Sequence, residues 1–587
     1  MKDGKLVSLG FSVGHDKGAV LIIDDKVQVG IMEERLSRVK RDKPFNTDLP
    51  LKSINYCLEE AGLTYDDVDT YCYNTAEMED FVEEQFMVYL AQPAEKLVFV
   101  PHHVAHAYST FMASGYEEAA VIVADAMGNV HSPNSKAHKY FKEKYGDLPK
   151  LPNGLKWGES ITLFKFTKSS YEEVLKKWIK YPEPYTYEDE ELSIGCMYAQ
   201  GTMQLVYDKK VKNWQAGKLM GLASYADQKW LDNEPFIANI IEDDDGNIVD
   251  FYIPGTQVYP EINYNADFRR KSNVAGIYQR EQVRLTTMLT KYVKQLTGLD
   301  NVCCSGGSFL NCNANEAVIK SELFKNCYFT PPADDSGIPL GAAFYGYQQL
   351  QKDKTIHNNP FLSPYFGKTY SRNEIVKDIQ SYLKLEGEEN DFFKDNNIIH
   401  FNTRKERDNY ITSQLMEHKP VAILQGGSEI GPRALGNRSI IANPSMYWMK
   451  DYINHDIKKR EWYRPFAPSV LFEHQSDIFD LDVFSPYMLV TTTVKEEWKS
   501  KIPAVVHTDG TSRYQSVTTE MNESYYNLIN TFYKESGLPV VLNTSFNGPG
   551  EPIVETPMDA IRSYIKNDMP VLVLEDIVIE KKDYRIY

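Results

Sequence analysis

The chain is 587 residues long, with 42% hydrophobic residues, 25% charged residues and a formal net charge of −18. This composition is typical of a soluble globular protein, and the length predicts two to four domains. The negative charge argues against binding to a nucleic-acid backbone, which needs a basic face.

Cysteine usage and hydropathy predict a cytoplasmic protein. The seven cysteines are an odd number and none forms a Cys-x-x-Cys pair, which indicates reduced, mostly buried thiols. The first residues, 1–5, lead directly into an apolar strand and lack the long apolar core of a signal peptide. The sequence has no run of about 18 apolar residues, so no membrane span is expected.

The first predicted elements are a strand at 6–11, a hairpin of strands at 19–23 and 27–32, and a helix at 51–61. Three strands followed by a helix are how an actin/Hsp70-like nucleotide-binding fold begins. A further buried-type strand at 119–124 suggests that the pattern recurs, which strengthens the prediction of an α/β fold of this class.

Two motifs carry candidate metal ligands. His102 and His106 follow a predicted strand and open a predicted helix, so they share one helical face and can hold a divalent metal. Asp125 stands at a strand end beside a glycine turn, a good place for a metal-binding carboxylate. The alternative is that the histidines are polar turn residues and that Asp125 forms only an Asx turn. The zinc-peptidase pattern His-Glu-x-x-His is absent.

Residues 131–190 are polar and rich in Lys, Tyr and Pro, which predicts an insertion with one strand near 161–166. Its aromatic residues are candidates to frame a pocket for an acceptor substrate; the alternative is a solvated excursion with a small core of its own. These residues are Tyr140, Tyr145, Trp157, Tyr171, Tyr185 and Tyr187.

A phosphate-binding arrangement is predicted further along the chain. A strand at 301–304 leads through Gly306 and Gly307 into a helix at 311–320, which presents backbone N–H groups to an anion. Asp334 and Asp335 follow the next strand and supply further carboxylates for the metal.

The pattern breaks between residues 358 and 372, which predicts a domain boundary and two domains, 1–362 and 363–587. In the second domain, cations and hydroxyls stand in loops after apolar strands. Each charge-assisted hydrogen bond contributes about 1.5–3 kcal/mol, so several of them can bind a small phosphate or carboxyphosphate group. The alternative is a set of surface salt bridges.

These segments together resemble the O-carbamoyltransferase family of antibiotic biosynthesis and nodulation-factor modification. The resemblance spans nearly the whole chain and includes the motifs Gly-Pro-Arg-Ala-Leu-Gly-Asn-Arg-Ser and Leu-Asn-Thr-Ser-Phe-Asn. The segments that carry it are 102–107, 217–223, 306–311, 431–439, 460–468, 509–513 and 542–547.

The resemblance implies an actin/Hsp70-like (ASKHA, Kae1-like) N-terminal domain, similar to the metal- and nucleotide-binding subunit of tRNA threonylcarbamoylation. It implies a YrdC-like α/β C-terminal domain, similar to the partner enzyme that makes the acyl-adenylate. Carbamoyl phosphate and ATP, with Mg²⁺, would give carbamoyladenylate in the C-terminal domain. The carbamoyl group would then pass to a hydroxyl of a small-molecule acceptor in the N-terminal domain, beside iron(II) or another divalent metal.

The resemblance also implies roles for individual residues. The metal ligands would be His102, His106, Asp125 and Asp335, the last preferred over Asp334 because the family's Asp stands two residues before the Gly. The adenylate would contact Lys218, Gly306, Gly307 and Asn311, and carbamoyl phosphate would contact Arg433, Lys458, Arg464, Arg513 and Ser545. His15 and Lys40 are the candidates at the acceptor end, with His15 as the general base because it titrates near neutrality.

The sequence departs from the family pattern at three positions. Gly427 replaces an expected Arg, Ala126 replaces an expected Gly, and Asn443 replaces a common Asp. Two alternative functions stay open: an ATP-dependent small-molecule kinase on the same scaffold, and a non-catalytic nucleotide-binding protein related to tRNA threonylcarbamoylation. The sequence does not identify the acceptor.

Overall fold

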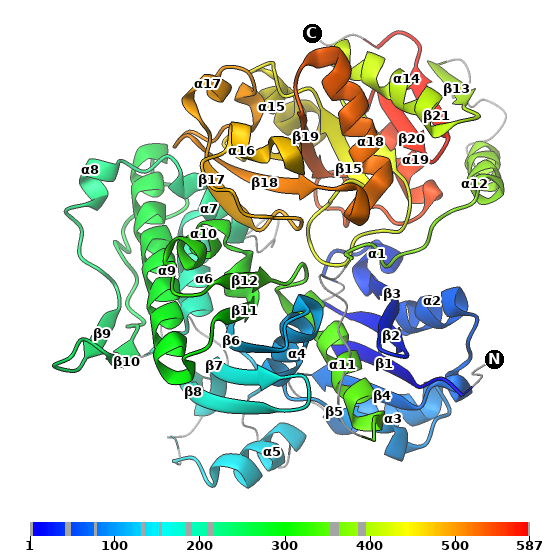
Figure 1. Ribbon diagram of the computed structural model, residues 1–587. Coiled ribbons are helices and arrows are strands. Elements are labelled where there is room, and N and C mark those ends of the chain that lie inside the picture. Colours follow the sequence, from blue (N-terminus) through cyan, green and yellow to red (C-terminus); the bar gives the residue numbers. More distant parts are fainter. Residues whose placement is uncertain are drawn as a thin grey trace. The chain divides into compact units, whose positions relative to one another are not determined.

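The structure is a computed structural model, and it describes residues 4–41, 48–75, 79–130, 135–149, 151, 155–182, 191–207, 216–352, 363–385 and 395–584. The chain forms two compact units, which are described separately (Figure 1). The N-terminal unit comprises Met1–Ser37 and Arg41–Leu362, and the C-terminal unit comprises Arg38–Lys40 and Ser363–Tyr587.

The N-terminal unit begins with a five-stranded sheet in the order β3-β2-β1-β4-β5. Strands β1, β2 and β3 are antiparallel, whereas β4 and β5 run parallel to β1. The strands are β1 (Val7–Val13), β2 (Gly18–Ile23), β3 (Lys26–Met32), β4 (Thr70–Thr75) and β5 (Leu97–Phe99). Helix α2 (Leu51–Ala61) packs its apolar face, including Ile54 and Leu58, against this sheet.

A second sheet repeats this topology in the order β12-β11-β6-β7-β8. Here β6, β7 and β8 are antiparallel, and β11 and β12 run parallel to β6. The strands are β6 (Glu118–Ala124), β7 (Leu155–Thr167), β8 (Tyr171–Pro182), β11 (Asn301–Ser305) and β12 (Asn326–Phe329). Two sheets of the same order and direction are the duplicated core of the actin/Hsp70-like fold, so the predicted fold class is confirmed for this unit.

The repeat corrects the predicted insertion. Residues 155–182 are two long strands of the second sheet, equivalent to β2 and β3 of the first. The sequence pattern did not reveal both strands, because charged residues in β8 interrupt the apolar and aromatic ones and no apolar run forms. Helix α5 (Lys136–Tyr145) precedes them, and Tyr185 and Tyr187 lie outside the described residues.

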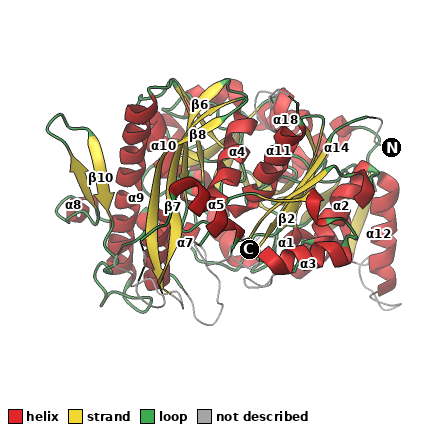
Figure 2. Ribbon diagram, turned by 90° about the horizontal axis from the view of Figure 1, so that it is seen from below, coloured by secondary structure: helices red, strands yellow, loops and turns green. Residues whose placement is uncertain are grey.

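Two buried helices, α4 (His102–Ser114) and α11 (Ile338–Leu350), pack against each other in the N-terminal unit (Figure 2). Gly341 allows this contact because a Cβ there would lie 1.7 Å from the carbonyl oxygen of Ala105. Gly10 on β1 likewise allows α11 to approach the first sheet, since its Cβ would lie 2.1 Å from the carbonyl oxygen of Pro339. These two glycines therefore bring the start of α11 close to the start of α4.

The remaining elements of the N-terminal unit surround the two sheets. The long helix α9 (Phe268–Thr297) buries apolar residues such as Leu285 and Leu289 and packs against α6, α7 and α10. The other elements are α1 (Glu33–Ser37), α3 (Glu79–Tyr89), α6 (Ile194–Leu205), α7 (Ala216–Ala223), α8 (Gln228–Leu231), β9 (Asn239–Glu242), β10 (Ile248–Tyr252) and α10 (Cys312–Lys320).

The C-terminal unit is built on a nine-stranded mixed sheet in the order β13-β21-β20-β14-β15-β19-β16-β18-β17. The strands are β13 (Asn396–His400), β14 (Val421–Leu424), β15 (Arg438–Ala442), β16 (Ala467–Leu471), β17 (Val490–Thr493), β18 (Thr511–Val517), β19 (Val540–Ser545), β20 (Val571–Leu574) and β21 (Ile577–Lys581). The unit is therefore of the α/β class, and its likeness to the YrdC-like enzyme stays a prediction.

Helices α14 (Arg404–Met416) and α18 (Thr519–Ser536) cover the core of this sheet with apolar residues such as Leu415 and Phe532. The other helices are α12 (Arg372–Leu385), α15 (Met449–Tyr452), α16 (Gln475–Ile478), α17 (Glu496–Lys499) and α19 (Pro557–Lys566). No helix in the described parts of the chain combines the length and the apolar composition needed to cross a membrane.

Candidate functional site

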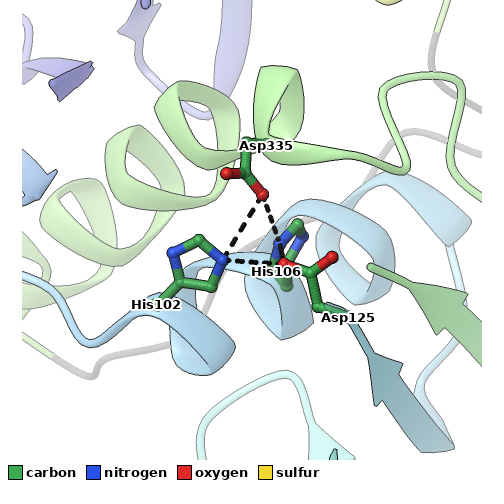
Figure 3. A group of neighbouring side chains, drawn as sticks. All are labelled: His102, His106, Asp125 and Asp335. Carbon is green, nitrogen blue, oxygen red and sulfur yellow. Dashed lines mark hydrogen bonds and ion pairs between the residues drawn. The ribbon is translucent and has the colours of Figure 1, made fainter. Parts of the chain in front are cut away.

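Four side chains from three distant parts of the N-terminal sequence meet at one point (Figure 3). His102 and His106 lie on consecutive turns of α4, Asp125 follows β6, and Asp335 lies in the turn that begins α11. The packing of α11 on α4 brings Asp335 to the histidines. The structure thus brings together the four residues that the sequence indicated as metal ligands.

The spacing of the four side chains fits a single metal ion. His102 Nε2 lies 3.2 Å from Asp125 Oδ2 and 3.4 Å from Asp335 Oδ1. His106 Nε2 lies 3.8 Å and 3.4 Å from the same two oxygens. Ligand atoms placed tetrahedrally about 2.1 Å from one ion are roughly 3.4 Å apart, so only small shifts would be needed.

The hydrogen bonds behind the two rings orient them toward this point. His102 Nδ1 lies 3.1 Å from Asn74 Oδ1, and His106 Nδ1 lies 3.1 Å from Ser305 Oγ. The Ser305 hydroxyl donates to a backbone carbonyl, which leaves its oxygen as the acceptor for His106. Each ring therefore carries its proton on Nδ1 and presents Nε2 to the carboxylates. His106 Nε2 is buried, and it faces the carboxylate oxygens of Asp335 and Asp125.

The carboxylates and imidazoles shift each other's pKa values. Burial lowers the pKa of His102, but Asp335 and Asp125 outweigh burial and raise it to about 10. Burial and Asp335 raise the pKa of Asp125, but the hydrogen bonds to His102 and His106 hold it below its usual range. Two negative charges thus face two protonated rings, and a divalent cation can replace the two protons.

His15 lies beside this cluster in the turn between β1 and β2. Its Nδ1 is 2.8 Å from Asp16 Oδ2 and its Nε2 is 3.4 Å from Asp335 Oδ2. Burial lowers the pKa of His15, whereas Asp16 and Asp335 raise it, to about 9. A general base must be unprotonated, so that role requires a bound metal to offset the carboxylates, and it stays a prediction.

Of the residues expected to hold the adenylate, Gly307 contacts the metal cluster directly. Gly306 and Gly307 follow β11, and the Gly307 N–H donates to Asp125 Oδ1 at 3.1 Å. Asn311 caps α10 and exchanges two hydrogen bonds of 3.0 Å with Gln279. Lys218 is half-buried on α7. The adenylate contacts of all four stay predictions.

A cluster of cations lies in the C-terminal unit. Burial lowers the pKa of Lys458, and the charges of Arg460, Lys40 and Arg464 lower it further. Burial together with Arg464 and Arg513 also lowers the pKa of Arg460. We call these five residues the cation cluster. In a chain with a net charge of −18, like charges gathered around the buried Lys458 indicate an anion site.

Lys458 also organises the loop after β19. Its Nζ donates to the carbonyl oxygen and hydroxyl of Ser545 and to Asn547 Oδ1, the last at 2.7 Å. The predicted pair Lys458 and Ser545 is therefore in direct contact. Arg464 Nη1 lies 3.7 Å from Glu461 Oε2. Arg433 is half-buried in the loop that joins β14 to β15.

Lys40 belongs to the segment 38–40, which packs as part of the C-terminal unit, and its expected role with His15 at the acceptor end stays a prediction. Arg38 anchors this segment by donating to the carbonyl oxygens of Pro552 and Ile553 at 3.0 and 2.7 Å. The charge of Lys40 consequently acts on Lys458, and Lys40 belongs with the cation cluster.

The structure gives a reason for Gly427 and shows the surroundings of the other two departures from the family pattern. A Cβ at Gly427 would lie 2.4 Å from the carbonyl oxygen of Gly367, so an arginine does not fit beneath the crossing segment 365–367. Ala126 is covered by the start of α6, where a Cβ at Gly195 would lie 2.4 Å from the Ala126 nitrogen. The third departure, Asn443, is buried and accepts a hydrogen bond from the backbone of Ser445.

Sequence reasoning missed several supporting residues. Arg460 was given no role at the anion site, although its position two residues after Lys458 is a usable signal. Asn74 and Ser305 stand at the ends of β4 and β11, where polar residues commonly face a functional site, but nothing local pairs them with a histidine.

Comparison with known families and proteins covers both units. The family model described as "Carbamoyltransferase N-terminus" matches residues 7–98 and 90–344, and "Carbamoyltransferase C-terminus" matches residues 412–581.

Two relatives align over nearly the whole chain. Nodulation protein NolNO of Sinorhizobium fredii is 28% identical, covering 97% of this chain and 79% of that protein. Uncharacterized protein sll1178 of Synechocystis is 29% identical, and the alignment covers 97% of this chain and 95% of that protein. Among solved structures, full-length HypF in its phosphate- and nucleotide-bound form aligns over 60% of this chain and 57% of its own, with 15% identity and a TM-score of 0.36. A likeness that distant carries no argument about mechanism.

Proposed function

The chain belongs to the carbamoyltransferase family, and from this premise we propose that it is an ATP-dependent O-carbamoyltransferase acting on a small-molecule hydroxyl. Carbamoyl phosphate, ATP and water would give carbamoyladenylate, phosphate and pyrophosphate in the C-terminal unit. The acceptor hydroxyl would then take the carbamoyl group in the N-terminal unit, releasing AMP.

The observation that carries the proposal is the cluster of His102, His106, Asp125 and Asp335. A buried site with two imidazole nitrogens and two carboxylate oxygens suits iron(II) and other divalent metals. Such a metal, when bound, would act as a Lewis acid on phosphate or carbonyl oxygens.

The cation cluster supports the activation step. Carbamoyl groups are resonance-stabilised and react poorly, so adenylation must first supply a good leaving group. Arg464, Arg460 and Lys458 would bind the phosphate of carbamoyl phosphate through charge-assisted hydrogen bonds. Lys458 donates to Ser545 and Asn547, so the hydroxyl and amide of these residues would lie beside the same anion.

The residues around the metal cluster would perform the transfer step. Gly306 and Gly307 lie at the end of β11, where the absence of side chains would let an adenylate phosphate approach the backbone. His15, held by Asp16, is our candidate to take the proton from the acceptor hydroxyl. The acceptor itself would be a sugar or a natural product.

The test is an incubation of the full chain with ATP, carbamoyl phosphate and a panel of hydroxyl compounds. We expect pyrophosphate release and an acceptor whose mass increases by one carbamoyl group. Absence of pyrophosphate with every acceptor would contradict the proposal, and ADP with a phosphorylated product would identify a kinase instead.

A further inference from the structure

A buried amide lies directly behind His102. Asn129 Oδ1 accepts the backbone N–H of His102 at 2.7 Å and the side-chain N–H of Asn74 at 3.0 Å. Asn129 Nδ2 donates to the carbonyl oxygen of Thr75 at 2.7 Å. Asn129 is 0% exposed and Asn74 is 4% exposed, so water does not compete for these bonds.

The bonds of Asn129 determine which way the Asn74 amide faces. Asn74 Nδ2 donates both to Asn129 Oδ1 and to the carbonyl oxygen of Val100 at 2.8 Å. Both of its N–H groups are then used, and Asn74 Oδ1 must face His102 Nδ1. A flipped Asn74 amide would place its oxygen against the oxygens of Asn129 and Val100. The observed orientation therefore favours the His102 tautomer with its proton on Nδ1, which leaves Nε2 for a metal.

The backbone of Asn129 is clamped to the second sheet. Its N–H donates to Glu159 Oε2 at 2.9 Å, and Glu159 Oε1 lies 2.5 Å from Lys176 Nζ. Glu159 is on β7 and Lys176 on β8, and both side chains are almost fully buried. A Cβ at Gly128 would lie 2.8 Å from Glu159 Oε2, so only glycine lets the chain pass this close.

From these contacts we infer that Asn129 is a positioning residue for the metal centre. It holds the backbone of His102 directly, sets the tautomer of the His102 ring through Asn74, and ties both to the β7–β8 hairpin. Its hydrogen bonds go to the backbone of His102, to Asn74, to Thr75 and to Glu159, and not to the metal-ligand atoms. The inference rests on the proposed metal site and adds the residue that preorganises it.

The experiment measures Co²⁺ binding to the metal-free full chain by titration and by the visible absorption of the bound ion. Wild type is compared with Asn129→Ala and Asn129→Asp. The alanine variant should bind Co²⁺ about 10- to 100-fold more weakly, the usual effect of losing an outer partner of a metal-bound histidine. The aspartate variant keeps an oxygen for both accepted bonds but loses the donor to Thr75, so its loss of Co²⁺ affinity should be smaller than that of the alanine variant.

Gln204→Ala is the matched control. Gln204 is another buried amide of the N-terminal unit, and its side chain donates to the carbonyl oxygens of Val258, Tyr259 and Ile262. This control should lose comparable thermal stability but keep the Co²⁺ affinity of wild type. If Asn129→Ala does not fold, Asn74→Ala replaces it, because that change removes the acceptor of His102 Nδ1 and leaves the bond of Asn129 to the His102 backbone.

The outcomes separate the inference from the proposed function. A wild-type chain that binds no Co²⁺ would contradict the metal site itself. A wild-type chain that binds Co²⁺, with Asn129→Ala binding equally well, would overturn only the positioning role. An equal loss in Asn129→Ala and Asn129→Asp would overturn it too, because the retained acceptor oxygen would then be irrelevant.

Discussion

The metal cluster of the N-terminal unit pairs opposite charges, whereas the cation cluster of the C-terminal unit brings like charges together. In the metal cluster, His102 and His106 face Asp125 and Asp335, so opposite charges adjoin. In the cation cluster, Lys458 and Arg460 adjoin further cations, and burial and mutual repulsion lower their pKa values.

This difference in charge predicts how each cluster responds when its ligand binds. The metal cluster is already oriented by Asn74 and Ser305, so a metal replaces protons without rearranging the fold. The cation cluster is held by carbonyl and amide oxygens and stores electrostatic repulsion, which an anion relieves. Anion binding should therefore stabilise the protein, whereas loss of a metal ligand should mainly abolish chemistry.

The largest effect is expected for His106→Ala. The change removes one of two imidazole ligands, so metal affinity should fall by about 100-fold or more, and carbamoyl transfer with it. Elemental analysis and transfer assays measure both. The control is His103→Asn, which alters a neighbouring buried imidazole that bonds Thr162 instead of facing the cluster. Full metal occupancy in His106→Ala would show that the ligand set is wrong.

A smaller effect is expected for Arg464→Gln. Loss of one charge-assisted hydrogen bond should raise the KM for carbamoyl phosphate about 10- to 100-fold, because 1.5–3 kcal/mol corresponds to that range. Transfer from supplied carbamoyladenylate should not change. Arg404→Gln, at an exposed arginine paired with Glu575, serves as the control. If both half-reactions fell together, Arg464 would be supporting the fold.

Inorganic phosphate should stabilise the C-terminal unit. At about 100 times its dissociation constant it would contribute about 2.7 kcal/mol, which is roughly 5–10 °C in the Tm of a unit of this size. His106→Ala should show the same increase and Arg464→Gln a smaller one, in scanning calorimetry against chloride of equal ionic strength. An equal increase in all three proteins would place phosphate elsewhere.

The smallest effect concerns His507 near the cation cluster. Burial lowers its pKa from 6.5 to about 4, with Arg513 and Lys450 adding to the shift and Asp509 opposing it. Protons then bind preferentially to the unfolded chain, so stability should fall as the pH drops from about 6.5 to about 4. Histidine NMR titration should show the pKa of His507 rising when phosphate binds. A pKa indifferent to phosphate would mean that the anion lies away from Arg513.

Local features of both units could be predicted from the sequence. The spacing of His102 and His106 predicted a shared helical face, and apolar runs located strands such as β6 and β14. These predictions depend on residues a few positions apart, where periodicity and turn chemistry act directly. The family motifs added the carbamoyltransferase assignment, because they are blocks of sequence in a constant order.

Tertiary packing decided the rest. Asp335 reaches His102 because Gly10 and Gly341 let α11 approach β1 and α4, a contact without a local signature. Residues 155–182 join the second sheet through pairing with β6, and Lys40 joins the cation cluster because its segment packs with the C-terminal unit. Contacts between residues hundreds of positions apart depend on how whole elements fit together, and that fit is a property of the folded core.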